Sequence, residues 1–192
     1  MTRIPSREAE HEALRTVASL MAAAARTAPK GRGVDSISSL VVDGDDIEAL
    51  ARTMEELAPG RPDVVSNSIR RDARNLRTSG SVVLIGVKGA PKKPENPLDC
   101  GACGFKTCAN LINARAKAAQ SGDYSGPSCV FTTIDLGVAL GSAAKVASDH
   151  NVDNRLMYTI GIAAKKLNWM DADVIIAIPL SATGKSIYFD RG

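Results

Sequence analysis

The sequence predicts an α/β fold, a three-layer-like sandwich of helices around one mixed sheet. Two apolar runs of strand length, "SVVLIGV" (81–87) and "DVIIAIPL" (173–180), have the character of buried strands. Segments of helical periodicity alternate with these runs along the chain. The 192 residues, 44% hydrophobic and 23% charged, are enough for one domain with a real hydrophobic core. We therefore expect a single domain over 1–192.

The first half of the chain alternates helical and extended patterns. Apolar residues recur at helical spacing over 6–27, and "TAPKGRG", with its proline and two glycines, ends this helix. The stretch "ISSLVVDG" (37–44) predicts a strand that ends in a turn. "DDIEALARTMEEL" (45–57) predicts a helix whose acidic first turn suits the helix dipole. An apolar stripe predicts a further helix over 62–80, before the buried strand 81–87.

The second half begins with a loop and a cysteine motif. Three prolines make 88–99 a loop, and "ANLINARAKAAQSG" continues the cysteine motif as a helix. Helices are expected at 130–148 and 153–167, and the strand 173–180 follows. The end, "SATGKSIYFDRG", predicts a glycine turn and a short last strand. The proline-rich loop marks the edge of an inserted metal-binding segment, 97–129.

Composition limits the function classes. The net charge of +3 and the 4% of aromatic residues do not favour nucleic acid as a partner. No apolar run approaches the roughly 20 residues that span a bilayer, so we expect no membrane. The charged start "MTRIPSREAEHEALR" lacks the apolar stretch of a signal peptide, which predicts a cytoplasmic protein. In a reducing compartment, clustered cysteines favour metal binding or catalysis over disulfides.

All four cysteines of the chain fall within one pattern, Cys100-x2-Cys103-x4-Cys108-x20-Cys129. The first three are close enough in sequence for one loop and a helix start to bring them around one centre. Gly101 and Gly104 let backbone amides turn toward the sulfurs, and such hydrogen bonds tune a cluster's potential. Four thiolates are the usual ligand set of an iron–sulfur cluster. We therefore interpret the four cysteines as metal ligands.

Three other interpretations of the cysteines stay open. A structural zinc site normally shows two close pairs of ligands, whereas here the second half is one cysteine far along the chain. A redox dithiol would use Cys100 and Cys103 but leave Cys108 and Cys129 without a role. Inert buried cysteines would explain one thiol better than three packed among glycines.

The stretch "NPLDCGACGFKTC", with a distant "GPSC", resembles a four-cysteine [4Fe–4S] domain. This domain occurs in corrinoid iron–sulfur protein subunits and in the RnfB-type subunit of electron-transport complexes. The resemblance covers 97–129. It implies one [4Fe–4S] cluster with Cys100, Cys103, Cys108 and Cys129 as its ligands.

A wider resemblance spans most of the chain. "AAAARTAPKGRGVDSISSLVV", "IDLGVALGSAAKVASDHNV" and "IPLSATGKSIYFDR" resemble parts of the nitroreductase-like flavin fold. In that fold a pattern like R-x-S-x-K/R holds the FMN phosphate. Arg26 and Lys30 match its basic positions, and Ala28 stands where the serine would be. The resemblance further implies that Lys185 and Arg191 close on the phosphate.

The basic turn itself offers a modest physical case for a phosphate site. Lys30, Arg32 and the glycines of "KGRG" supply charge and free backbone amides, a combination that favours anions. The same cations would equally suit a solvated loop after a helix, because positive charge stabilises a helix C-terminus. Both interpretations of the turn stay open.

As a whole, the arrangement resembles the family described as uncharacterised ferredoxin-domain proteins. It implies an iron–sulfur redox protein whose one [4Fe–4S] cluster relays electrons to or from a bound FMN in a small-molecule oxidoreductase. A flavin-free, ferredoxin-like electron carrier or iron–sulfur sensor is the alternative. A zinc-stapled structural module is the third candidate.

Two surface features bear on partners. Arginines fall on one face of the 62–80 helix, where they form a solvated face or a docking patch for an acidic redox protein. They are Arg70, Arg71, Arg74 and Arg77. The small residues of "LGVALGSAAKVA" predict close helix packing, either inside the fold or as the seam of a homodimer.

Overall fold

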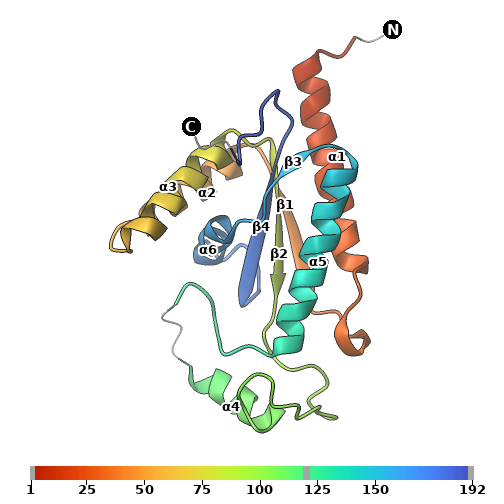
Figure 1. Ribbon diagram of the computed structural model, residues 1–192, viewed down its shortest axis with the longest axis vertical. Coiled ribbons are helices and arrows are strands. Elements are labelled where there is room, and N and C mark those ends of the chain that lie inside the picture. The colour runs from red at the N-terminus through yellow and green to blue at the C-terminus, as the bar shows by residue number, and fades with distance from the viewer. Residues whose placement is uncertain (1–2, 119–121, 190–192) are drawn as a thin grey trace.

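The computed structural model describes residues 3–118 and 122–189, which form one antiparallel sheet between two layers of helices (Figure 1). The sheet has the strand order β1-β2-β4-β3. The strands are β1 (Ile37–Val42), β2 (Ser81–Val87), β4 (Val174–Ser181) and the short β3 (Asp153–Asn154). The α/β sandwich is confirmed.

The expectation of a mixed sheet is corrected, because every strand pairing in the described part of the chain is antiparallel. Leu40 pairs with Leu84, and Leu84 pairs with Ala177 on its other side. The connection between β1 and β2 contains two helices rather than one. Two helices return the chain to the end of the sheet at which β1 finished, and β2 therefore runs antiparallel to β1.

Helices cover both faces of the sheet (Figure 1). One face packs against α1 (Ser6–Thr27) and α5 (Val130–Asp149). The other packs against α2 (Asp45–Leu57), α3 (Asp63–Arg77) and α6 (Tyr158–Lys166). Every residue of β2 is buried, which explains why its sequence is a continuous apolar run rather than an alternating one.

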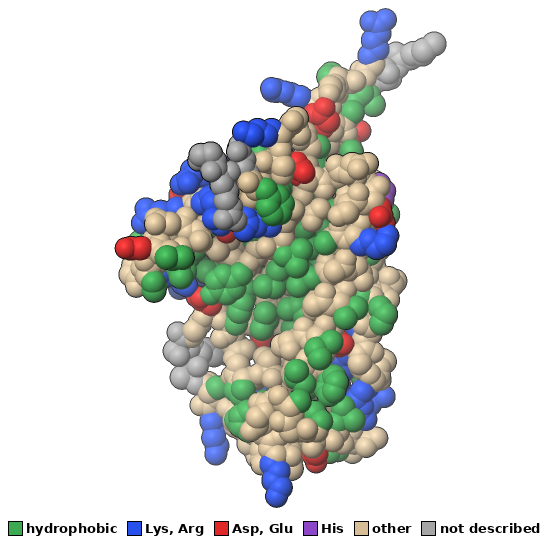
Figure 2. Space-filling model, in the orientation of Figure 1, with side chains coloured by type: hydrophobic (Ala, Val, Ile, Leu, Met, Phe, Trp, Pro, Cys, Tyr) green, Lys and Arg blue, Asp and Glu red, His purple; other side chains and the backbone are tan. Residues whose placement is uncertain are grey.

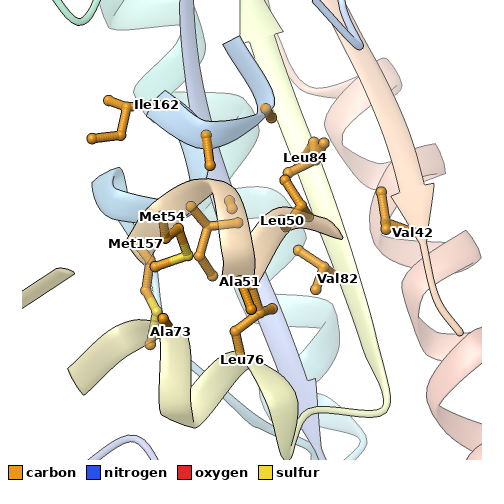
Figure 3. Close-up of a cluster of buried hydrophobic side chains, with 14 of the residues drawn as sticks. Val42, Leu50, Ala51, Met54, Ala73, Leu76, Val82, Leu84, Met157 and Ile162 are labelled. Atoms are coloured by element: carbon orange, nitrogen blue, oxygen red, sulfur yellow. The ribbon is translucent and has the colours of Figure 1, made fainter. Parts of the chain in front are cut away.

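Alternate residues of β2 belong to two separate hydrophobic clusters, as expected for side chains that alternate across a strand. Val83 and Ile85 pack in the cluster under α1 and α5. Val82 and Leu84 pack in the cluster under α2, α3 and α6, and Figure 3 shows Leu50 next to them. These two clusters form the core of the sandwich.

The segment that carries the cysteines projects beyond the sheet, at the lower end of the molecule in Figure 1. It leaves β2 at Val87, runs through a loop without strand structure, and forms α4 (Cys108–Lys117). Thr107 caps this helix, because its Oγ1 accepts the amide hydrogen of Asn110 at 3.2 Å. The chain returns to the sandwich at α5. We call residues 88–129 the cysteine end.

Two expectations about the second half are corrected. The helix expected over 153–167 starts only at Tyr158, because residues 153–154 pair with β4 as β3. The last strand expected in "SATGKSIYFDRG" is not formed in its described part, which turns instead. Tyr188 in this segment is buried, and its hydroxyl lies 2.9 Å from Ser79 Oγ. The buried ring, rather than strand pairing, therefore attaches this segment to the fold.

Helix α5 is long and apolar enough, by length and composition, to cross a bilayer. In the structure it packs against α1 and against β2, and its buried residues include Leu136, Ala139 and Ala143. It is therefore one of the two helices that cover this face of the sheet.

Candidate functional site

Three of the four cysteines line one pocket where the cysteine end meets the sandwich. They are Cys100, Cys108 and Cys129. The remaining lining residues are Arg32, Pro91, Lys92, Leu98 and Phe131. Cys103 does not line this pocket, although it lies in the turn between Cys100 and Cys108. Two thiols separated by 20 intervening residues, Cys108 and Cys129, thus share one small space.

The backbone around Cys100 and Cys103 is tightly turned. Gly101 and Gly104 have φ values of 72° and 85°, a region that glycine enters without steric cost. The amide of Gly104 donates to the carbonyl oxygen of Gly101 at 2.9 Å, closing a turn over Ala102 and Cys103. The amide of Cys108 donates to Asp99 Oδ1 at 2.6 Å, which satisfies a free donor at the start of α4. The positive φ values give the turn expected at the two glycines, but the Gly104 amide, expected to face a sulfur, donates to Gly101 instead.

A polar network links Cys129 to Gly89, in the loop that follows β2, and to Asp173, the residue before β4. The amide of Cys129 donates to the carbonyl oxygen of Gly89 at 2.8 Å, and the amide of Gly89 donates to Asp173 Oδ2 at 2.7 Å. Arg115 pairs with the same carboxylate oxygen at 2.5 Å and also donates to the carbonyl oxygen of Pro127. Asp173 therefore joins the end of β2, the end of α4 and the approach to Cys129.

Gly89 is required at this junction because the chain segments approach closely. A Cβ atom at this position would lie 2.7 Å from Arg115 Nη1 and 2.8 Å from Ser128 Cβ. Sequence reasoning missed Gly89, Arg115 and Asp173. The available signal was Asp173 itself, a charged residue that directly precedes a buried apolar strand.

Lys92, which lines the pocket, belongs to a buried ion pair. Lys92 Nζ pairs with Asp135 Oδ2, and the two side chains are only 4% and 5% exposed. Lys92 Nζ also donates to the carbonyl oxygens of Gly31 and Val34, at 3.0 and 2.8 Å. Asp135 Oδ1 accepts the amide hydrogen of Gly31 at 2.9 Å. The pair thus joins the proline-rich loop, the basic turn and α5, and it too was missed, although Asp135 is an isolated acid in an apolar helix.

Two cations expected at a flavin phosphate are engaged within the fold. Lys30 Nζ donates to three carbonyl oxygens at the C-terminus of α1, those of residues 25, 26 and 28. Arg26 donates to the carbonyl oxygen of Ile37 at 2.6 Å and pairs with Asp35. Burial raises the pKa of Asp35, but the hydrogen bonds from Arg26 and from the amide of Ile37, together with the charges of Arg26 and Lys30, outweigh burial, and the pKa is lowered. Lys30 therefore stabilises the C-terminus of α1 in this structure.

Arg32 has a different position from Lys30, although both belong to the basic turn. It lies in the short 3-10 helix η1 (Gly31–Gly33) with a φ of 60°. Its Nη1 donates to the carbonyl oxygen of Asn96 at 2.6 Å and lies 3.4 Å from that of Lys92. Because Arg32 also lines the cysteine pocket, the structure connects the basic turn to the cysteines.

The remaining expected phosphate ligands lie elsewhere. Lys185 follows Ser181, the end of β4 that lies next to the start of β2. Arg26 contacts Ile37, which pairs with Val87 at the opposite end of β2. Lys185 and Arg26 are therefore at opposite ends of the sheet, and Arg191 lies outside the described residues. Within the described chain, the expected cations do not surround one phosphate-sized space.

The four cysteines are the right kind of ligand for a thiolate-bound metal centre. The structure does not, however, bring their sulfur atoms close enough together to hold a metal ion. Over residues 3–118 and 122–189, no three side chains of His, Cys, Asp or Glu are grouped to hold a metal ion. The donors that such a centre needs are nevertheless close to one pocket: three thiols at its wall, a fourth in the adjacent turn, and turned backbone amides.

Comparison with solved structures shows the fold. A nitroreductase with bound FMN from Desulfitobacterium hafniense superimposes with a TM-score of 0.56 at 14% identity, covering 96% of this chain and 82% of that one. A nitroreductase family protein from Clostridium novyi gives a TM-score of 0.50 at 16% identity, over 98% and 79% of the two chains. The nitroreductase-like fold expected from the sequence is confirmed.

Comparison of sequences shows the family. An uncharacterized protein of Archaeoglobus fulgidus is 46% identical over 182 residues, which are 95% of this chain and 94% of that protein. Residues 125–191 match a family described as "Uncharacterized protein containing a ferredoxin domain", and this span includes Cys129. The chain therefore belongs to one family with the archaeal protein.

Proposed function

We propose that this chain is a cytoplasmic redox protein that holds one [4Fe–4S] cluster on Cys100, Cys103, Cys108 and Cys129. One observation carries the proposal: Cys129, far along the chain, lines the same pocket as Cys100 and Cys108. Four thiolates are the common ligand set of such a cluster. The family matched over 125–191, a span that includes Cys129 but not the other three cysteines, is described as containing a ferredoxin domain, which supports this chemistry.

Each element of the cysteine end has a role in this proposal. Cys103 lies in the turn formed by Gly101 and Gly104, and a movement of this turn toward the pocket would complete the ligand set. Asp173, through Gly89, keeps Cys129 at the opposite wall. Metal sites are rarely preformed without their ligand, and binding free energy then closes the site. When bound, the cluster supplies one-electron transfer.

A two-centre oxidoreductase, in which the cluster relays electrons to or from FMN, is the second candidate. It is favoured by the fold, since the nitroreductase of D. hafniense binds FMN. The side chains expected at the phosphate do not fit it within one chain, because Lys30 caps α1 and Arg26 pairs with Asp35. The flavin-free electron carrier is therefore the better supported of the two.

The test is metal and flavin analysis of protein purified without oxygen, with one serine variant at each cysteine. We expect about four irons and four sulfides per wild-type chain, the composition of this cluster type. Each Cys→Ser variant should lose most of the iron. Ala102→Ser is the matched control, because it adds a hydroxyl between Cys100 and Cys103 without removing a thiol.

Three results would change the proposal. Full iron content in Cys103→Ser would remove that residue from the ligand set. Zinc in place of iron would support the zinc-stapled module and contradict a redox centre. Flavin that copurifies in a fixed ratio to iron would replace the electron carrier with the two-centre oxidoreductase.

A further inference from the structure

We propose that an acidic redox protein docks over the cysteine pocket, at the lower end of the molecule, rather than on the arginines of α3. The docking surface consists of exposed apolar residues rimmed by lysines. The apolar residues are Leu98, Ile112, Phe131 and Ile134, and the rim is formed by Lys93, Lys106 and Lys117. This inference rests on the proposed function and names the kind of partner that would exchange electrons with the cluster.

The apolar centre of this surface adjoins the cysteines. Leu98 and Phe131 line the pocket that Cys100, Cys108 and Cys129 share, and both are also exposed to solvent. Ile134 follows Phe131 by one helical turn of α5, and Leu98 and Ile134 are 50% and 51% exposed. Figure 2 shows hydrophobic side chains gathered over this end of the molecule. Exposed apolar residues that adjoin a functional centre indicate an interaction site.

The rim of this surface is basic. Residues 88–118 contain six Lys and Arg and two Asp and Glu, a net charge of 6 − 2 = +4. Lys93, Lys106 and Lys117 are exposed, and one of the two acids, Asp99, accepts the amide hydrogen of Cys108. Figure 2 shows Lys and Arg side chains projecting from the margin of this end. A positive rim steers a negatively charged partner and raises its association rate.

The arginines of α3 are a weaker docking site, because acids of the same chain pair with two of the four. Arg77 pairs with Glu48 and Glu55 of α2, at 2.9 and 2.7 Å. Arg71 pairs with its neighbour Asp72 at 2.7 Å. Figure 1 also places α3 beside the upper part of the sheet and α4 below the lower end of the sheet, so a partner on α3 would be away from the cysteines.

Contact through Leu98 and Phe131 would place a partner directly over the pocket that holds the thiols. Interfaces between redox proteins are small and transient, so a few apolar residues inside a charged rim are sufficient. The acidic partner supplies the complementary charge and leaves quickly after electron transfer.

The experiment measures electron transfer in the cluster-loaded full chain. The probe is a reduced acidic ferredoxin of the clostridial type, mixed with the oxidised protein in an anaerobic stopped-flow instrument at several ionic strengths. Lys93→Glu/Lys106→Glu should lower the second-order rate at low salt by about tenfold or more, and should flatten its salt dependence. The matched control, Arg70→Glu/Arg74→Glu, reverses two exposed charges on α3 and should change the rate less than twofold.

Iron and sulfide are assayed on each sample first, so that two failures can be distinguished. Wild-type protein without iron and sulfide would overturn the proposed function and this inference together. A loaded protein in which the lysine variant transfers electrons at the wild-type rate would overturn the docking surface alone. A larger loss in the α3 variant would move the docking site to α3.

Discussion

The sandwich and the cysteine end are held together by different interactions. The sandwich has two hydrophobic clusters, and its central strand β2 is buried along its whole length. Over its described residues, 88–118 and 122–129, the cysteine end has no strand, and the one buried side chain of α4 is Leu111. Apolar burial gives the sandwich a defined structure by itself, whereas the cysteine end depends on a few polar contacts and on its ligand.

This difference separates stability from function. Variants in the sandwich should change the free energy of unfolding with little effect on iron per folded chain. Variants at the junction, where Lys92 meets Asp135 and Arg115 meets Asp173, should affect both. The predictions below test this division, from the largest expected effect to the smallest.

Breaking the buried ion pair should have the largest effect. Lys92→Met leaves the carboxylate of Asp135 buried without its cation, which costs about 3–5 kcal/mol in the free energy of unfolding. Urea denaturation measures this loss. Lys93→Met is the matched control, because Lys93 is exposed, and it should cost no more than about 0.5 kcal/mol. Equal stabilities of the two variants would show that the pair contributes nothing.

Truncation in the core should change the sandwich alone. Leu50 is fully buried between α2 and the sheet, so Leu50→Ala should lower the free energy of unfolding by about 2–5 kcal/mol. The iron bound per folded chain should stay at the wild-type value. Leu20→Ala, at an exposed position of α1, serves as the control and should have a much smaller effect. Iron loss in the folded Leu50→Ala protein would contradict the separation of the two regions.

Crowding the junction at Gly89 should lower iron binding at the cysteine end. Gly89→Ala places a methyl group against Ser128 and Arg115, which displaces the segment that leads into Cys129. We expect iron per chain to fall at least twofold, measured after anaerobic reconstitution. Gly137→Ala, on α5 where a Cβ would meet no atom within 4 Å, should bind iron as wild type does. Normal iron content in Gly89→Ala would mean that Cys129 tolerates displacement.

The smallest expected effect is on the pH dependence of the free energy of unfolding, through Asp123 in the segment that leads to Cys129. The hydrogen bond from Arg61 lowers the pKa of Asp123, and burial opposes it only in part. A lowered carboxyl pKa contributes stability above the unfolded value of about 3.9, and this contribution is lost as the pH falls through the folded value. The stability difference between wild type and Asp123→Asn should therefore be present in full at pH 7 and be smaller at pH 3, below the unfolded pKa.

Denaturation curves between these two pH values measure this difference. Glu8→Gln is a suitable control, because Glu8 is an exposed residue of the first turn of α1. A difference between wild type and Asp123→Asn that stayed constant with pH would contradict the role of the Arg61 pair.

The elements of the sandwich could largely be predicted from the sequence. The helices expected over 6–27 and 45–57 and the strand expected over 81–87 have these bounds in the structure. Periodicity and local turn signals determine such elements, because they depend on neighbours in sequence. The direction of the strands was not predicted, since it depends on how many helices each connection contains.

The junction could not be predicted, because its partners are distant in sequence. Asp135 and Gly31 lie 104 positions apart, and Gly89 and Asp173 lie 84 positions apart. A single sequence identifies Asp135 and Asp173 as charged residues in apolar surroundings, but does not show what neutralises them. For the same reason, the expected group of phosphate ligands combined Arg26 with Lys185, which lie at opposite ends of the sheet.

The most direct test of the account is an iron, sulfide and zinc assay, with an absorption spectrum, on wild-type protein purified without oxygen. The account predicts about four irons and four sulfides per chain, with the broad visible absorption of a [4Fe–4S] centre. Zinc bound in their place, or a folded protein that takes up neither metal after reconstitution, would contradict it.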